Sequence, residues 1–193
     1  NKQIIVEKNP LYWDADRVQL NEIHFLPIDN VSREDFMFRA GQIHVTSSIP
    51  TEKIEVYKEQ YPDNISISPY YGTYYYRINL NKEPLNNKLI RKALSLSIDR
   101  ELITEKVAKG GQIPAFSFTP PDPNGYFPPT NLEYNPSKAQ ELLKEAGYSK
   151  ADSLTFELLY NTSEGHQKIA EAMQQMWKEA LGVNIVLTNT DWK

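Results

Sequence analysis

Short runs of apolar or alternating residues, interspersed with helically spaced ones, predict a chain that mixes β-strands with amphipathic helices. Residues 4–6 are continuously apolar and residues 18–25 alternate roughly between apolar and polar, so both are expected to be strands. Ser32 is a suitable N-cap for a helix that ends at Gly41. The other elements expected before the tyrosine-rich segment are a helix over residues 51–60 and short strands over residues 43–45 and 65–67.

The later part of the chain has a clearer helical period. Asn87 is placed to cap one helix and Asp99 the next, which is expected to stop at Gly110. Asn135, directly before a proline, is placed to open a helix that Gly147 closes. The remaining expected elements are an irregular proline-rich loop over residues 113–129, strands over 154–160 and 183–188, and an amphipathic helix over 163–181. Together these patterns predict an α/β fold with mixed sheets flanked by helices.

Residues 70–79, YYGTYYYRIN, are the least ordinary segment, because five of the ten are tyrosine. Tyrosine is common in strands and on surfaces that are partly apolar and partly wet, so a strand is expected here. Its side chains would alternate between two faces. One face would carry Tyr71, Thr73, Tyr75 and Arg77, and the other Tyr74, Tyr76 and Ile78. Two interpretations stay open: aromatic packing within a sheet, or the wall of a ligand site.

Composition narrows the function classes only slightly. The chain has 193 residues, 40% of them hydrophobic, and a formal net charge of −4. Such a chain is long enough to bury a core without disulfides or metals. The isoelectric point near 5.5 argues against a nucleic-acid partner. No apolar run approaches the roughly 20 residues of a membrane helix, so no direct membrane span is expected.

Several kinds of chemistry have no support in the sequence. The chain lacks cysteine, which excludes disulfides, cysteine nucleophiles and iron–sulfur clusters. Its three histidines, His24, His44 and His166, have no metal-ligating partner at helical spacing, so no metal site is expected. Nucleophile elbows, phosphate-binding loops and dinucleotide fingerprints are also missing. We therefore expect neither a cofactor nor an enzymatic activity.

His166 is the histidine with the most informative position, because it falls in the first turn of the helix expected over residues 163–181. A helix N-terminus offers unpaired amide donors and a partial positive charge, which attract carboxylates. An imidazole there would add charge to an anion site, since histidine ionises near neutral pH. The other interpretation, an exposed or capping histidine, is equally compatible with the sequence.

Several segments together resemble one protein family. They are LYWDADRVQLNEIHFLPI from residue 11, YYGTYYYRINLNKEPLNNKLIRKALSLSIDRELI from residue 70, AFSFTPP, NPSKAQELLKEAGY, LTFELLYNTSEGHQKIA and WKEALGVNIVLTNTDWK. In these segments the chain is similar to the peptide- and nickel-binding solute-binding proteins of ABC importers, and among them to the oligopeptide binders. The similarity covers essentially the whole chain and is far more specific than any single motif above.

The resemblance implies an internal fragment of a longer, two-lobed clamp that closes over an extended peptide. Residues 1–71 would belong to the first lobe, and residues 72–193 to the first part of the second, peptide-binding lobe. The implied function is capture of oligopeptides and their delivery to the ABC permease membrane subunits, without covalent chemistry. The implied location is the periplasm, or the outer surface by a lipid anchor in a Gram-positive source. The alternatives are another solute (a dipeptide, a haem-like compound or a nickel chelate) or, in a different class, a hydrolase.

The resemblance also implies which residues contact the ligand: Tyr70, Tyr75, Ser47, Ser48, His166 and Trp192. The tyrosines would line the cleft, His166 would lie near the peptide carboxyl terminus, and Trp192 would lie beside a side-chain pocket. Three positions depart from the family pattern, and one of them is His44, which stands where the family usually has an Asp. Gly72 stands where some relatives have a half-cystine, and Ala108 stands where they have a lysine that can meet the carboxylate of a short peptide.

Overall fold

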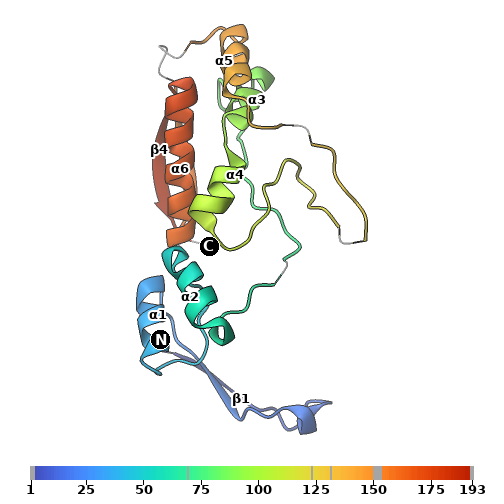
Figure 1. Cartoon of the computed structure of the whole chain (residues 1–193), viewed down its shortest axis with the longest axis vertical. Coiled ribbons are helices and arrows are strands. Elements are labelled where there is room, and N and C mark those ends of the chain that lie inside the picture. The colour runs from blue at the N-terminus through green and yellow to red at the C-terminus, as the bar shows by residue number, and fades with distance from the viewer. Residues whose placement is uncertain (1–2, 69, 123, 131, 150–153, 192–193) are drawn as a thin grey trace. The chain divides into compact units, whose positions relative to one another are not determined.

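The structure is a computed structural model that describes residues 3–68, 70–122, 124–130, 132–149 and 154–191. By their internal contacts these residues form two compact units, Asn1–Pro50 and Thr51–Lys193. This division falls earlier in the chain than the lobe boundary expected at residues 71 and 72, which stays a prediction. Two strands and a helix dominate the first unit (blue in Figure 1) and a helix-covered parallel strand pair dominates the second.

The first unit is a β-hairpin followed by a helix. Strands β1 (Ile4–Glu7) and β2 (Glu22–Phe25) pair antiparallel, with Ile4 opposite Phe25, and the connection between them holds the short helix η1 (Ala15–Arg17). Helix α1 (Val31–Arg39) begins at Asn30, whose side chain accepts a 2.8 Å hydrogen bond from the Arg33 amide. The first strand and the helix are confirmed, but the expected N-cap Ser32 is wrong, because Asn30 occupies the capping position with the necessary acceptor.

The second unit opens with three short helices: η2 (Thr51–Lys53), α2 (Ile54–Gln60) and η3 (Pro62–Asn64). Helices α3 (Lys88–Leu96) and α4 (Arg100–Leu102) follow, and the chain continues from α4 into a π-helical turn, η4 (Ile103–Ala108). Asn87 and Asp99 cap α3 and α4 as expected. The second of these segments ends at Lys109, which takes the left-handed conformation (φ 57°), and not at Gly110.

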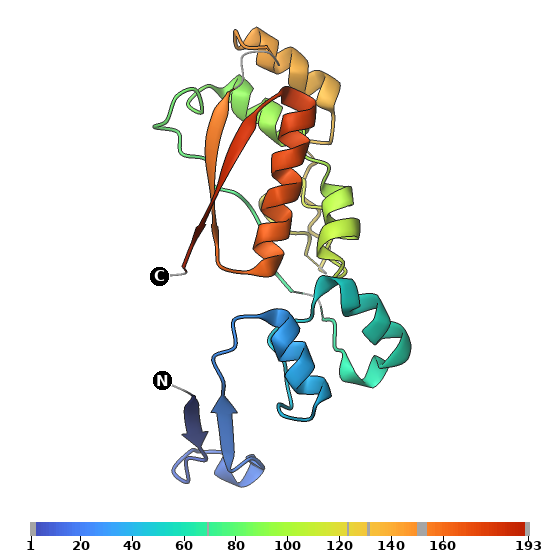
Figure 2. The same cartoon turned by 90° about the vertical axis from the view of Figure 1, so that its left-hand side faces the viewer.

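Helix α5 (Pro136–Glu145) and a β–α–β unit complete the chain. Strands β3 (Thr155–Asn161) and β4 (Asn184–Thr190) are parallel, with Thr155 opposite Asn184, and helix α6 (Glu164–Leu181) joins them. Figure 2 shows α6 running along the strand pair. Parallel strands require such a crossover, and the sequence predicted all three elements. Asn135 caps α5, and Gly147 follows it with a positive φ of 88°, both as expected.

One face of α6 builds the core of this unit. Ala170, Met173, Trp177 and Leu181 recur at helical spacing and are buried against α3, α5 and the two strands. Trp177 also donates a 2.8 Å hydrogen bond from Nε1 to the Leu94 carbonyl, so its polar edge is satisfied inside the core. Gly182 ends the helix with a φ of 71°, and the Val183 amide returns to the Trp177 carbonyl at 3.2 Å.

Three expected strands are missing from the described residues. The tyrosine-rich segment 70–79 and the short runs at 43–45 and 65–67 all lie outside regular structure. A strand needs a neighbour for its backbone hydrogen bonds, and no described segment pairs with any of them. The residue types therefore indicated only a local preference for a strand, and a local preference does not supply the neighbouring strand that a sheet requires. In the part of the chain that the structure describes, no helix is long and apolar enough to cross a membrane.

We expect the α6 stripe to dominate the stability of the second unit. Leu181 is only 1% exposed, so Leu181→Ala should lower the free energy of unfolding by about 2–5 kcal/mol, from lost burial and the cavity left behind. Leu102→Ala, at a helical position that is 45% exposed, is the matched control and should cost less than about 1 kcal/mol. Urea denaturation followed by circular dichroism measures both. Equal losses for the two variants would contradict this assignment of the core.

Candidate functional site

The N-terminus of α6 places His166 on the side of the helix that faces the protein. Ser163 is the N-cap residue, and His166 lies in the first turn. It stands four residues before the buried Ala170, so the same helical stripe that forms the core continues to the imidazole. The histidine is partly buried and belongs to the second unit, and the expectation of its place in the helix is confirmed.

Tyr74 of the segment 70–79 contacts this histidine directly, and Tyr76 contacts Tyr74 in turn. The imidazole Nδ1 and the Tyr74 hydroxyl are 2.9 Å apart, and the two rings stack with centroids 5.3 Å apart and planes within 13°. The Tyr74 hydroxyl in turn lies 3.4 Å from the Tyr76 hydroxyl, and these two rings meet edge to face at 5.7 Å. His166, Tyr74 and Tyr76 therefore make a continuous row of polar groups, which we call the tyrosine–histidine row.

Partial desolvation favours the protonated form of both phenols of this row. Desolvation raises the pKa of Tyr74, and the hydrogen bond from Tyr76 partly offsets that rise. Desolvation also raises the pKa of Tyr76, strongly, and its hydrogen bond and charge interaction with Tyr74 add to the effect. Both hydroxyls are thus held as neutral groups that donate one proton each and accept others.

The sequence placed Tyr74 and Tyr76 on one face of the segment and Tyr75 on the other, and the contacts agree. Tyr75 meets the Phe118 ring edge to face at 4.9 Å, away from the tyrosine–histidine row. Tyr70 is 91% exposed. No hydrogen bond or ring contact joins His166 to Tyr70 or Tyr75 in the described ranges of the chain. Side-chain alternation thus survives here without a partner strand.

The two candidate serines belong to the first unit. The buried Glu34 of α1, only 8% exposed, accepts hydrogen bonds from the Ser47 amide at 2.8 Å and from the Ser47 hydroxyl at 3.0 Å. Ser48 follows in the same loop and is exposed. One carboxylate therefore fixes the loop that carries both serines. The last candidate, Trp192, lies outside the described residues.

Lys168, near the start of α6, is already paired with a carboxylate. The Lys168 ammonium lies 3.1 Å from the Glu52 carboxylate and 3.2 Å from the Thr51 hydroxyl. The pKa of Glu52 is lowered, first by a hydrogen bond from its own backbone and then by Lys168. This ion pair links η2 to α6. His166, in the first turn of α6, contacts Tyr74 instead.

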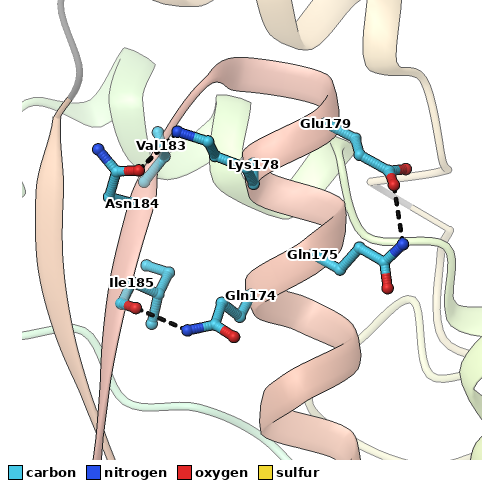
Figure 3. Close-up of a pocket in the computed structure, with 7 residues that line it drawn as sticks. All are labelled: Gln174, Gln175, Lys178, Glu179, Val183, Asn184 and Ile185. Carbon is cyan, nitrogen blue, oxygen red and sulfur yellow. Dashed lines mark hydrogen bonds between the residues drawn. The ribbon is translucent and has the colours of Figure 1, made fainter.

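A hollow between α6 and β4 offers no comparable chemistry (Figure 3). Its polar side chains are engaged with one another: Gln174 donates to the Ile185 carbonyl at 2.8 Å, Gln175 to Glu179 at 2.8 Å and Lys178 to Asn184 at 2.6 Å. None of the predicted ligand residues lines it. Among the described residues there is also no group of three or more His, Cys, Asp or Glu that could hold a metal ion.

Sequence reasoning did not single out Tyr74, Tyr76 or Phe118. The available signal was the period of two in the tyrosine-rich segment, which put Tyr74 and Tyr76 on one face. The sequence could not show that this face meets the first turn of α6, where His166 contacts Tyr74 across a separation of 92 residues. Such long-range pairings depend on the packing of the whole unit.

Comparison with known proteins gives one consistent family. The description "Bacterial extracellular solute-binding proteins, family 5 Middle" matches residues 1–193. The periplasmic oligopeptide-binding protein OppA of Salmonella typhimurium is 40% identical over 100% of this chain, and the chain spans 37% of that relative. The structure of the Escherichia coli murein tripeptide-binding protein MppA matches with a TM-score of 0.92 at 40% identity, over 100% of this chain and 39% of that one.

A further solved structure contains a peptide. Haemophilus influenzae OppA in complex with RPPGFSPFR matches with a TM-score of 0.84 at 37% identity, again over 100% of this chain and 39% of that one. These proteins are two-lobed binding proteins of which the present chain covers a part, in agreement with the expected fold class and with the resemblance found in the sequence.

We expect Glu34 to control the loop that carries the candidate serines. Glu34→Ala removes both acceptors of Ser47, so the Ser47 amide should exchange with deuterium roughly tenfold faster, as for the loss of about one buried hydrogen bond. Ser47→Ala is the matched control. It removes the hydroxyl but keeps the hydrogen bond from the backbone amide of residue 47 to the Glu34 carboxylate, so the exchange rate of that amide should change little. Unchanged exchange in Glu34→Ala would show that other contacts hold the loop.

Proposed function

The chain belongs to the family of bacterial extracellular solute-binding proteins, family 5, and we propose that the whole protein captures oligopeptides outside the cytoplasmic membrane and delivers them to an ABC permease. Its relatives are solute-binding proteins. The observation that supports peptides most directly is the match, over the full chain, to a relative whose structure holds a bound peptide. We place the protein in the periplasm on the same grounds, as its relatives are named periplasmic.

The proposed mechanism is binding and closure without covalent chemistry. An extended peptide would be held through its backbone, while hydrated pockets accept varied side chains. Closure of two lobes around it would then signal occupancy to the permease. We propose residues 1–71 and 72–193 as the parts of the two lobes that this chain supplies. Another solute or a hydrolytic activity is less well supported, because the relatives compared above bind peptides.

The proposed ligand contacts are the six residues inferred from the sequence: Tyr70, Tyr75, Ser47, Ser48, His166 and Trp192. The exposed rings of Tyr70 and Tyr75 are available to a ligand, and the Glu34 contacts give Ser47 a fixed position. His166 combines an imidazole with the first turn of a helix, where the helix dipole is positive, which suits a peptide carboxylate. Lys168 would not compete for that carboxylate, since Glu52 already neutralises it.

Titration calorimetry of the whole protein with tri- and tetrapeptides tests this function, with His166→Ala as the variant. The wild-type protein should bind peptides without hydrolysing them. His166→Ala should weaken binding by roughly 0.5–1.5 kcal/mol, the value of one hydrogen bond in a wet site. The loss should be greatest for the peptide length whose carboxylate reaches α6.

Two controls make the result specific. Peptides amidated at the carboxyl terminus should respond least to His166→Ala, because they lack the charge that the site attracts. His24→Ala removes a histidine of the first unit that is paired with Glu22 at 3.0 Å, and it should leave peptide affinity unchanged. Product formation would overturn the binding-protein proposal. Equal losses for free-acid and amidated peptides at every length would show that His166 only shapes the pocket.

A further inference from the structure

We propose that Tyr74, supported by Tyr76, is a positioning residue that presents the Nε2–H group of His166 as a hydrogen-bond donor to the peptide carboxylate. This inference rests on the proposed function, in which His166 meets that carboxylate. The evidence for it is the geometry of the tyrosine–histidine row. The Tyr74 hydroxyl lies 2.9 Å from Nδ1 of His166, and the Tyr74 ring is stacked on the imidazole.

The direction of this hydrogen bond follows from acid–base strength. A neutral imidazole carries one proton, on either nitrogen, and the other nitrogen is an acceptor. A phenol O–H is a stronger acid than an imidazole N–H, and an imidazole nitrogen is a stronger base than a phenol oxygen. Tyr74 therefore donates and Nδ1 of His166 accepts, so the proton of the neutral ring sits on Nε2.

Tyr76 can supply a hydrogen bond to the Tyr74 hydroxyl when that hydroxyl donates to His166. A Tyr74 hydroxyl that gives its proton to Nδ1 has lone pairs left to accept, and the Tyr76 hydroxyl at 3.4 Å is in position to donate to it. Partial desolvation, which raises the pKa of both tyrosines, favours the protonated hydroxyls. If the imidazole takes up a second proton, the row can reverse: Nδ1–H donates to Tyr74, and Tyr74 donates to Tyr76. In both states Nε2 keeps its hydrogen.

The stacking contact fixes the plane of the ring, while the hydrogen bond from Tyr74 sets its tautomer. With planes within 13° of each other, the imidazole cannot turn about its axis without losing the contact with Tyr74. In the described part of the chain, His166 has no recorded hydrogen bond other than the one from Tyr74, so Nε2 is left to a ligand or to water. A donor of fixed direction beside helix amides is what recognition of a carboxylate requires.

The first test is spectroscopic and does not depend on the ligand. In the whole protein labelled with ¹⁵N-histidine, and above the ordinary titration range of histidine, the His166 signals should show a protonated Nε2 and an Nδ1 that accepts a hydrogen bond. In Tyr74→Phe the ring stays but the hydroxyl is gone, so the Nδ1 signal should move to the position of a nitrogen without a hydrogen bond. Tyr61→Phe is the matched control.

Tyr61 suits this purpose because it is 51% exposed, as Tyr74 is, and its ring also contacts another tyrosine, Tyr57, at 5.8 Å. The control variant should leave the His166 signals unchanged. A wild-type spectrum with the proton on Nδ1, or an Nδ1 signal that Tyr74→Phe does not move, would overturn the inference.

The second test is a double-mutant cycle for peptide binding. Tyr74→Phe should weaken a free-acid peptide roughly two- to fivefold, the loss expected for one positioned hydrogen bond, and should weaken the amidated peptide less. In the His166→Ala background, Tyr74→Phe should have no further effect, because it acts through the histidine. Tyr76→Phe should give a smaller loss than Tyr74→Phe.

The outcomes separate this inference from the function on which it rests. If His166→Ala leaves affinity unchanged, the proposed carboxylate contact fails, and the positioning role fails with it. If His166→Ala weakens binding but Tyr74→Phe does not, the proposed function stands and only the positioning role is wrong. Additive losses in the double variant would show that Tyr74 contacts the peptide directly, which also overturns the inference.

Discussion

The burial of one stripe of α6 is the constraint on which the second unit depends. Ala170, Met173, Trp177 and Leu181 bring together α3, α5 and the two parallel strands, and the hydrogen bond from Trp177 to the Leu94 carbonyl fixes the helix against the end of α3. A parallel pair of strands has little stability by itself and needs a covering helix. The rotation of α6 about its own axis is therefore set by its core residues.

That rotation determines what the first turn of the helix can do. His166 continues the core stripe by one turn, so it meets Tyr74, whereas Lys168, two positions later, reaches Glu52. The packing of the core thus directs two basic side chains to different partners. Lys168 forms an ion pair with Glu52, and His166 contacts the Tyr74 hydroxyl. The ligand site that we propose at the start of α6 therefore depends on packing several turns away.

The sequence predicted the helices more accurately than it predicted the strands and the long-range contacts. The helix caps at Asn87, Asp99 and Asn135 follow from local backbone chemistry and were found where expected. The helix stop expected at Gly110 lies one residue earlier, at Lys109. The strand over residues 70–79 was wrong, because pairing is a property of two segments and tyrosine content describes one. The alternation of its side chains was right, as the opposite contacts of Tyr74 and Tyr75 show. The tyrosine–histidine row joins distant segments, so no local pattern could reveal it.

We propose that the start of α6 meets the carboxyl terminus of a bound peptide. A crystal structure of the whole protein with an oligopeptide that has a free carboxyl terminus tests this most directly. The account predicts a carboxylate oxygen about 3 Å from Nε2 of His166, with Nδ1 still bonded to Tyr74. A peptide bound with its carboxylate held elsewhere, at every length that binds, and His166 turned only toward water would contradict it.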